Sequence, residues 1–431
     1  GDIFGAPLAI EALMAFFLES TLIGLFFFGW DRLSKEKHLA VTWLMALGTN
    51  LSALWILVAN GWMQHPVGSV FNIDTMRMEL TSFSEVIFNP VAQVKFVHTV
   101  SAGYVTGAVF VLAISSWYLL KGRDLAFARR SFAIASAFGL ASALSVIVLG
   151  DESGYELGDV QKVKLAAVEA EWNTHPAPAA FTVFGLPNAE TQTTDFALKI
   201  PAVLGLIATR SLDEEVPGLT ELKAQHLQRI IRGQEAYVLM KQYRAGDKSA
   251  ATVARFNAVS DDLGYGMLLT AYTDDVANAT AEQIALAVEA SVPKVWPLFW
   301  SFRIMVACGV SMLLLFAFAF WHSAKRTVNK PKWLLKFAIF SLPLPWIACE
   351  AGWFVAEYGR QPWAIGEILP THMAVSQLSV SDIWFSLATI AVLYTVFVII
   401  EMWLMTKYAK IGPSALHTGK YDLESPVAKE A

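Results

Sequence analysis

The sequence contains few cysteines and few charged residues. Only two of the 431 residues are cysteines, and both Cys308 and Cys349 lie in apolar runs, which argues against a disulfide framework. Charged residues make up 16% of the chain and the net charge is −5, so the basic surface that nucleic-acid binding requires is missing. The first residue is Gly rather than Met and no signal peptide is visible, so we expect an upstream segment to precede this chain.

Hydrophobic residues, by contrast, make up 55% of the chain, which is typical of a polytopic membrane protein with some soluble mass. A helix needs about 20 predominantly apolar residues to cross a bilayer. We therefore predict an all-α fold, a bundle of seven transmembrane helices with a large helical loop. The runs that reach the required length are residues 7–30, 39–62, 91–120, 131–149, 295–321, 334–356 and 383–405.

Basic residues are concentrated in the loops that follow the first, third, fifth and seventh runs. The alternate short loops hold little beyond Arg77 and Arg360. Because cytoplasmic loops carry an excess of Lys and Arg, we expect the first residue outside and the C-terminus in the cytoplasm. The basic residues are Arg32, Lys35, Lys37, Lys121, Arg123, Arg129, Arg130, Lys325, Arg326, Lys330, Lys332, Lys407 and Lys410.

The polar segment between the fourth and fifth runs is long enough to be functional and is expected on the extracytoplasmic side. Residues 159–172 and 219–244 show amphipathic helical patterns, and Thr280-Ala-Glu-Gln283 is typical of a capping box before a third helix. The expected organisation is therefore four spans, an outer loop, three spans and a cytoplasmic tail. Their boundaries are 1–149, 150–294, 295–406 and 407–431.

One histidine and one methionine are candidate haem ligands. Among the eight histidines, only His98 lies well inside a predicted span, and Met305 lies at a similar depth in another, two residues after Arg303. A His/Met pair can bind one haem axially and Arg303 can hold a propionate. A hydrogen-bonded interior histidine and simple core packing of the methionine remain the alternatives.

Four carboxylates lie in predicted spans, where ionisable groups are costly and commonly mark ion or proton routes. Glu11 and Glu19 are separated by about 12 Å along a straight α-helix and point about 80° apart. Glu350 and Glu357 share a face of the sixth run, and Glu357 is followed closely by Arg360. Glu357 is a candidate metal ligand and Glu350 a proton carrier, while neutral, hydrogen-bonded carboxyls with a structural role remain possible.

Three polar residues at the start of the outer segment are candidates for a quinol site. Gln161, Lys164 and Glu169 fall along one predicted amphipathic helix, and such groups can hydrogen-bond the oxygens of a quinol head group. The alternative is a solvated helix face, which composition alone favours.

Four short stretches carry a resemblance that runs over essentially the whole chain. They are Lys95-Phe-Val-His98, Gly158-Asp-Val-Gln-Lys162, Phe302-Arg-Ile-Met305 and Gly359-Arg-Gln-Pro-Trp363. Together they resemble subunit I of cytochrome bd-type quinol oxidases with a long quinol loop. The resemblance also implies two further spans before this chain, nine in a full subunit, and an upstream histidine that ligates a high-spin haem.

The resemblance assigns roles to individual residues. It implies that His98 and Met305 ligate a low-spin haem b, and that Glu357 accompanies a high-spin haem b. Glu11 would lie beside haem d, and Glu19 on the proton route. The remaining expected roles are haem or propionate contacts for Arg303, Arg360 and Trp353, and quinol binding for Lys164, Glu169 and Gln161.

The implied activity is oxidation of ubiquinol or menaquinol at the outer face of a bacterial inner membrane and reduction of O2 to water. Cytoplasmic protons would be consumed, which generates a proton motive force without pumping. The implied partners are a second large membrane subunit and a very small single-span one. Two alternatives stay open: a haem-b electron-transfer subunit without oxygen chemistry, and a proton-coupled transporter, which the sequence disfavours because it shows no inverted repeat and no broken helices.

Overall fold

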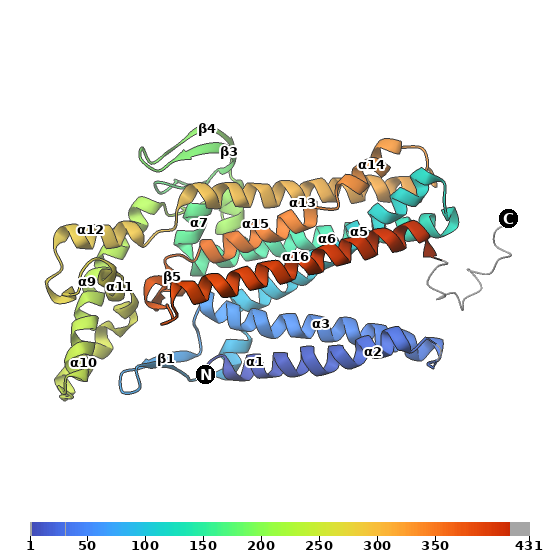
Figure 1. Ribbon diagram of the computed structural model, residues 1–431. Helices are drawn as coiled ribbons and strands as arrows, with labels where there is room; N and C mark the ends of the chain where they lie inside the picture. The colour runs from blue at the N-terminus through green and yellow to red at the C-terminus, as the bar shows by residue number, and fades with distance from the viewer. Residues whose placement is uncertain (1, 31, 414–431) are drawn as a thin grey trace.

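The structure is a computed structural model that describes residues 2–30 and 32–413. Within these ranges it contains six helices long and apolar enough to cross a membrane, and seven when one bent pair counts as a span, which confirms the predicted helical membrane bundle. The helices run side by side, and a polar domain lies at one end of the bundle (Figure 1). The part of the predicted tail beyond Pro413 lies outside the described residues.

The bounds of the bundle helices follow the predicted apolar runs and extend beyond most of them. The spans are α1 (Gly5–Ala12) with a π-helical segment (Leu13–Glu19) and α2 (Ser20–Phe28), α3 (Lys35–Gln64), α5 (Pro90–Lys121), α6 (Leu125–Val160), α13 (Val295–Ala324), α14 (Lys332–Phe340) with α15 (Leu344–Tyr358), and α16 (Val380–Ile411). A short helix α4 (Phe83–Ile87) precedes α5, and β1 (Ser69–Asn72) and β2 (Arg77–Leu80) form a hairpin after α3.

Local sequence defines both ends of α5. The Asn89 side chain accepts a hydrogen bond from the Val91 N–H at 3.0 Å, and Pro90 occupies the first turn, where its missing N–H costs nothing. Gly122 ends the helix at φ +68°, a conformation that glycine adopts without strain. These signals hold His98 about 12 Å, or eight residues, from the start of the helix.

The bundle core lies where α5, α6, α13 and α14 meet. Leu112, Phe132, Phe316 and Leu334 are fully buried there, one from each helix. Because lipid tails are as apolar as these side chains, close packing rather than water exclusion holds the helices together. Gly139 allows the closest approach, since a Cβ at this position would overlap the Phe316 ring.

The sixth span is broken, contrary to the expectation of unbroken helices. Its two halves, α14 and α15, meet at an angle of 41°. Pro343 and Pro345 explain the break, because a proline lacks the N–H of the helical ladder and its ring clashes with the preceding turn. The break leaves α15 as a short helix that carries Glu350 and Glu357 toward the polar domain (Figure 1).

The first span also departs from a straight α-helix. The π-helical segment Leu13–Glu19 lies between α1 and α2, so the angle between Glu11 and Glu19 is not the one expected from an α-helical spacing. Both carboxylates nevertheless face α3, as hydrogen bonds to Ser52 and Thr49 show.

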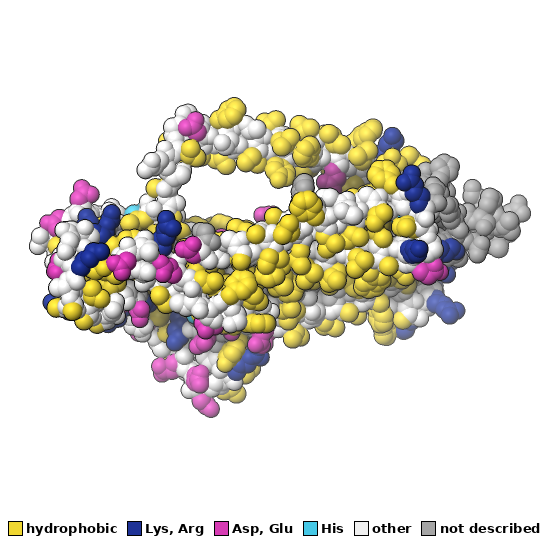
Figure 2. All heavy atoms as spheres, turned by 90° about the horizontal axis from the view of Figure 1, so that it is seen from below, with side chains coloured by type: hydrophobic (Ala, Val, Ile, Leu, Met, Phe, Trp, Pro, Cys, Tyr) yellow, Lys and Arg dark blue, Asp and Glu magenta, His cyan; other side chains and the backbone are white. Residues whose placement is uncertain are grey.

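Helix α16 stands apart from the other helices. None of its residues is buried, and a space-filling view shows an open passage between it and the rest of the molecule (Figure 2). Its C-terminal end is held by the Tyr118 hydroxyl, which donates to the Ala409 carbonyl at 2.8 Å, and by Arg123, which donates to the carbonyl oxygens of Lys410 and Ile411.

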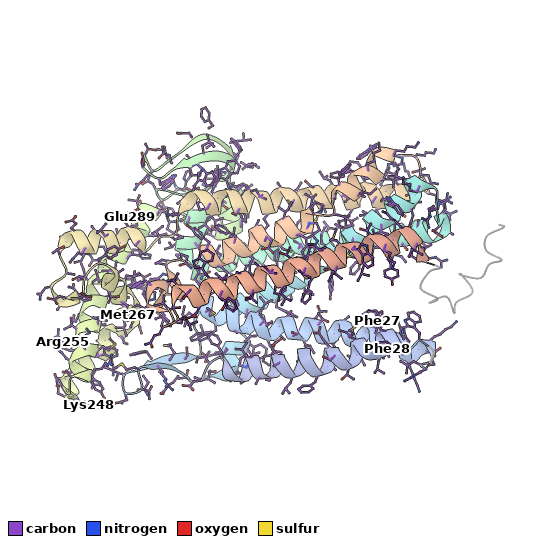
Figure 3. All side chains as sticks on the ribbon, in the orientation of Figure 1. Phe27, Phe28, Lys248, Arg255, Met267 and Glu289 are labelled. Atoms are coloured by element: carbon purple, nitrogen blue, oxygen red, sulfur yellow. The ribbon has the colours of Figure 1, made fainter. Side chains whose placement is uncertain are left out.

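The polar domain, defined as α7 to α12, is helical with one added hairpin. Lys248 and Arg255 lie in it, at the opposite end of the molecule from Phe27 and Phe28 of α2 (Figure 3). Its elements are α7 (Lys162–Glu169), β3 (Phe181–Asn188), β4 (Thr193–Ile200), α8 (Val203–Ala208), α9 (Leu219–Arg244), α10 (Ala250–Val259), α11 (Leu263–Leu268) and α12 (Ala281–Ala290).

Two predictions for this domain are confirmed, one is wrong, and one element was missed. Helix α9 has the predicted bounds, and Thr280 and Gln283 form the predicted capping box. The single helix expected over residues 159–172 is interrupted at Gln161, where the backbone leaves the helical region. The β3–β4 hairpin was not predicted, although its β-branched and aromatic residues favour strands.

The crossing of α9 and α11 offers a test of the domain's packing. The backbones of Gly233 and Gly266 touch, and a Cβ on Gly266 would overlap the Gly233 carbonyl. We expect Gly266→Val to destabilise the polar domain by roughly 1–3 kcal/mol, since two backbones must move apart. Limited trypsin digestion should cleave α9 faster in this variant. Gly107→Val in α5, where an added Cβ meets nothing within 4 Å, is the control, and equal cleavage of both would contradict the packing argument.

Candidate functional site

His98 lies in a tight site between α5 and α6. A Cβ built on Gly150 of α6 would lie 3.3 Å from the imidazole Cε1, a tight contact that glycine avoids. The Nδ1 atom is buried and has no hydrogen-bond partner among the described residues. Buried polar atoms almost always have a hydrogen-bond partner, so an unpartnered one requires an explanation. A bound cofactor that contacts the imidazole would provide it.

Met305 has a similar environment on α13. A Cβ built on Gly352 of α15 would lie 2.8 Å from the Met305 sulfur. Helix α13 packs against both α6 and α15, and α5 packs against α6. His98 and Met305 therefore belong to one contiguous group of four helices, and a glycine of a neighbouring helix leaves room at each side chain.

A polar network surrounds Glu357 at the end of α15. Its Oε1 accepts hydrogen bonds from Asn60 Nδ2 at 2.9 Å and Gln64 Nε2 at 3.2 Å, both from α3. Its Oε2 accepts from Arg360 Nη2 at 2.6 Å. Lys95 Nζ of α5 donates to Asn60 Oδ1 at 3.1 Å, which links a second helix to the same carboxylate.

Arg360 retains unused donors. Its Nε and Nη1 atoms are buried and lack partners among the residues described. A guanidinium with one edge on Glu357 and the rest free can bind a second carboxylate, such as a propionate. The other residue expected near a cofactor, Trp353, is half-exposed on α15 and makes none of the contacts of this network.

Lys164 of α7 is buried with an exposed fraction of only 4%. Its Nζ donates to Gln64 Oε1 and Gln161 Oε1, both at 2.7 Å, and to the Ala356 carbonyl at 3.0 Å. Burial lowers the pKa of Lys164 well below its usual value, and the positive charge of Lys95 acts in the same direction. Gly359 makes room for the lysine stem, because a Cβ there would lie 2.8 Å from its Cγ.

Gln64 connects Lys164 to the network around Glu357 and was not identified from the sequence. It accepts from Lys164 and donates to Glu357, so a continuous hydrogen-bonded path runs from α7 to α15. Gln161 donates to both the side-chain and the backbone oxygen of Gln64 at 3.0 Å. These hydrogen bonds to Gln64 give a physical reason for the helix interruption at Gln161. The available sequence signal was a lone glutamine at the last position of an apolar helix.

Glu169 and Arg303 form a separate buried pair. Arg303 Nη2 donates to Glu169 Oε2 at 2.6 Å, and its other N–H groups donate to backbone carbonyls, including those of Val168 and Thr182. Burial raises the pKa of Glu169 to about 7, although Arg303 opposes the shift. The structure thus places Glu169 with Arg303 rather than with Gln161 and Lys164.

The two carboxylates of the first span each meet a hydroxyl of α3. Ser52 Oγ donates to Glu11 Oε1 at 3.0 Å, and Thr49 Oγ1 donates to Glu19 Oε1 at 2.7 Å. Ser and Thr hydroxyls can both donate and accept, so each pair can take part in proton transfer.

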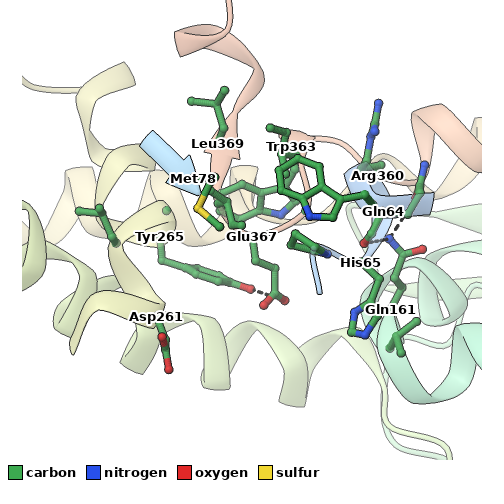
Figure 4. Close-up of a pocket in the computed structure, with 18 of the residues that line it drawn as sticks. Gln64, His65, Met78, Gln161, Asp261, Tyr265, Arg360, Trp363, Glu367 and Leu369 are labelled. Carbon is green, nitrogen blue, oxygen red and sulfur yellow. Dashed lines mark hydrogen bonds between the residues drawn. The ribbon is translucent and has the colours of Figure 1, made fainter. Parts of the chain in front are cut away.

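A cavity of about 1310 Å³ opens beside Gln64 and Lys164, between the bundle and the polar domain. Figure 4 shows His65, Gln64, Gln161 and Arg360 gathered at one side of it. A volume above the usual 300–1,000 Å³ of ligand pockets accommodates a ring with polar substituents and leaves further space. The cavity is contiguous with the cluster of Lys164, Gln161 and Gln64, and through Gln64 with the Glu357 network.

Comparisons with known proteins agree on the family. The family model described as cytochrome bd terminal oxidase subunit I matches residues 1–413. The chain is 57% identical over 418 residues to the cytochrome bd-II ubiquinol oxidase subunit 1 of Escherichia coli (strain K12), covering 97% of this chain and 81% of that one. It is 32% identical over 424 residues to the cytochrome bd ubiquinol oxidase subunit 1 of Bacillus subtilis (strain 168), covering 98% and 78%.

A solved structure supports the fold. The bd oxidase from Geobacillus thermodenitrificans superposes with a TM-score of 0.71 at 24% sequence identity, covering 95% of this chain and 79% of that one. The fold agreement, the family match over almost the whole chain and the two relatives lead to one conclusion. The chain belongs to the cytochrome bd terminal oxidase subunit I family.

Proposed function

We propose that this subunit oxidises quinol at the extracytoplasmic face and serves the reduction of O2 to water with cytoplasmic protons. Because quinol protons leave on the outer side and the protons for water come from the cytoplasm, charge is separated across the membrane without proton pumping. The observation that carries the proposal is the hydrogen-bonded path from Lys164, beside the cavity, through Gln64 to Glu357. It joins the candidate quinol residues to the candidate haem carboxylate.

The residues present suit haem groups. His98 offers a buried imidazole nitrogen without a partner, and Arg360 offers two buried donors for a propionate. Glycines 150 and 352 leave space beside His98 and Met305. His98 and Met305 would hold a low-spin haem b, Glu357 would accompany a high-spin haem b, and Glu11 would face haem d. When bound, the haems supply the one-electron transfers and the oxygen chemistry that side chains cannot.

Lys164 and Gln161 would bind the quinol head group. Both reach the cavity, and each carries groups that hydrogen-bond a hydroxyl or carbonyl oxygen. Glu169, paired with Arg303 behind them, would hold α7 in place and respond to pH near 7, where its carboxyl changes charge. The name of the relative that is 57% identical favours ubiquinol as the substrate.

The proton supply would come from the opposite face. Glu19, paired with Thr49, would take protons from the cytoplasmic side, and Glu11, paired with Ser52, would deliver them toward haem d. This direction places the polar domain outside a bacterial inner membrane and the C-terminus in the cytoplasm, in line with the basic loops. A second large membrane subunit and a very small single-span subunit would complete the assembly.

Spectroscopy of the complete complex tests the proposal. We expect a reduced-minus-oxidised spectrum with low-spin haem b and a red-region chlorin band, CO-sensitive changes in the chlorin band, and quinol-dependent O2 uptake. Haem b signals without CO binding or O2 uptake would instead support an electron-transfer subunit. A purified complex without haem would overturn the assignment of His98 and Met305.

A further inference from the structure

A second cluster of titratable residues lines the same cavity at a distance in sequence from Lys164. It consists of Tyr265, Glu367, His226 and Arg229, and none of them has a role so far. In Figure 4 the Tyr265 hydroxyl points at the Glu367 carboxylate, and Trp363 lies between this pair and Gln64. The cavity therefore has a second polar wall, separated from Gln64 by Trp363.

The backbone fixes the position of Glu367. It lies in the turn between β5 (Trp363–Ile365) and β6 (Leu369–Pro370), at φ +58°, a conformation that costs a non-glycine residue roughly 1–3 kcal/mol. The Gly366 N–H donates to the Met63 carbonyl of α3 at 2.8 Å. On the other side, Gly264 of α11 touches the Glu367 carbonyl so closely that no Cβ fits. The turn is thus clamped between the bundle and the polar domain.

Hydrogen bonds then orient the Glu367 carboxylate. Its Oε1 accepts from the Tyr265 hydroxyl at 3.0 Å, and its Oε2 accepts from Arg229 Nη1 at 2.7 Å. Arg229 is itself held by Asp262, to which its Nε donates at 2.6 Å. Tyr265 is fully buried, whereas the Glu367 side chain is 52% exposed. The carboxylate therefore faces both the cavity and water.

His226 gives the tyrosine proton a second acceptor. The Ser291 hydroxyl donates to the Val288 carbonyl at 2.6 Å, so its oxygen accepts from His226 Nδ1–H at 2.7 Å. This leaves His226 Nε2 without a proton, 3.2 Å from the Tyr265 hydroxyl. Burial lowers the pKa of His226 to about 4, so the ring is neutral at pH 7. The single Tyr265 proton thus lies between two bases.

From this geometry we propose that Glu367 accepts a proton from the quinol bound in the cavity and releases it to the outer aqueous phase, with Tyr265 and Arg229 as positioning residues. The proposal rests on the proposed quinol oxidation. In the step, the quinol O–H bond breaks, an O–H bond forms at Glu367, and the quinol electron leaves to the enzyme's electron acceptor. The carboxyl then loses its proton to water on its exposed side.

The pH dependence has a definite sign. The step needs an ionised carboxylate as the proton acceptor, so we expect the rate of quinol oxidation to fall at low pH, which gives the pH profile an acid limb. The charged or titratable groups that face Glu367 are Arg229 and His226 of α9, Tyr265 of α11 and His65 after α3. Removing the Tyr265 hydroxyl withdraws a hydrogen bond that favours the charged form, so the acid limb should move to higher pH.

The test compares Glu367→Gln with Glu289→Gln in the assembled complex. Glu289 of the polar domain pairs with Lys223 at 2.6 Å and does not line the cavity (Figure 3). We expect Glu367→Gln to lower kcat for ubiquinol about 10²-fold, the low end for loss of a general base, and to abolish the acid limb. Oxygen uptake driven by an artificial electron donor that bypasses the quinol site should stay at the wild-type rate.

Two further variants separate the possible outcomes. Glu367→Asp should keep the acid limb at a reduced rate, and Tyr265→Phe should move the limb to higher pH. If Glu367→Gln fails to assemble, an unmoved limb in Tyr265→Phe overturns the inference. If the wild-type complex oxidises quinol and Glu367→Gln behaves like Glu289→Gln at every pH, the inference also fails. A wild-type complex that oxidises no quinol would instead overturn the proposed function.

Discussion

His98→Ala is expected to remove the low-spin haem b signal from the reduced-minus-oxidised spectrum completely. The Nδ1 atom of its imidazole is buried and has no hydrogen-bond partner among the described residues, which makes His98 the candidate iron ligand on α5. Quinol-driven O2 uptake should be lost with the signal, since electrons enter at this point in the proposed function. The measurement is the absorbance difference spectrum of the purified complex, normalised to protein.

Two comparisons strengthen this test. His322 lies near the C-terminal end of α13, far along the helix from Met305, and its imidazole is hydrogen-bonded to Thr327. His322→Ala should leave the spectrum unchanged. Met305→Leu keeps the side-chain volume beside Gly352 but removes the sulfur, so the haem should remain and change from low spin to high spin. An unaltered low-spin signal in His98→Ala would contradict the ligand assignment.

Lys164→Ala is expected to lower quinol oxidation about 10- to 100-fold while the haem content stays at the wild-type level. Hydrogen bonds to a charged group contribute about 1.5–3 kcal/mol, which corresponds to this range of rates. The substitution also leaves the oxygens of Gln64, Gln161 and Ala356 without their shared donor. The effect should therefore include a raised KM for ubiquinol, measured by O2 uptake.

The matched control is Lys248→Ala, which removes an exposed lysine of the polar domain, 3.6 Å from Asp74 (Figure 3). It should leave both kcat and KM unchanged. Loss of haem from Lys164→Ala would point instead to a structural role for the lysine. An unchanged quinol rate with normal haem would remove Lys164 from the proposed site.

The membrane helices were predictable because their signals are local. Each span is a long apolar run, and α9 follows an amphipathic pattern that begins after the helix-breaking Pro217. The break at Pro343 was also encoded locally but was not read from the sequence. The π-helical segment Leu13–Glu19 and the interruption at Gln161 could not be predicted this way, since tertiary contacts override the local pattern.

The candidate site was predictable only in part. His98, Lys164 and Glu357 are conspicuous because a polar group in or beside an apolar run is costly. Gln64 and Glu367 are not, since an uncharged amide at a helix end and a glutamate in a turn are ordinary. Their importance comes from partners 293 residues away in the case of Gln64 and 102 residues away in the case of Glu367. Such contacts cannot be read from spacing.

The separation of α16 has a consequence for handling the protein outside a bilayer. A helix held at its C-terminal end and without buried side chains has nothing interlocking to fix its distance from its neighbours, so we expect the molecules beside it to set that distance. We expect acyl chains to fill this role in the bilayer and detergent to replace them after extraction. Removal of lipid should therefore change the position of α16 before it affects the polar domain. Lipid nanodiscs are the better medium for measuring the position of α16.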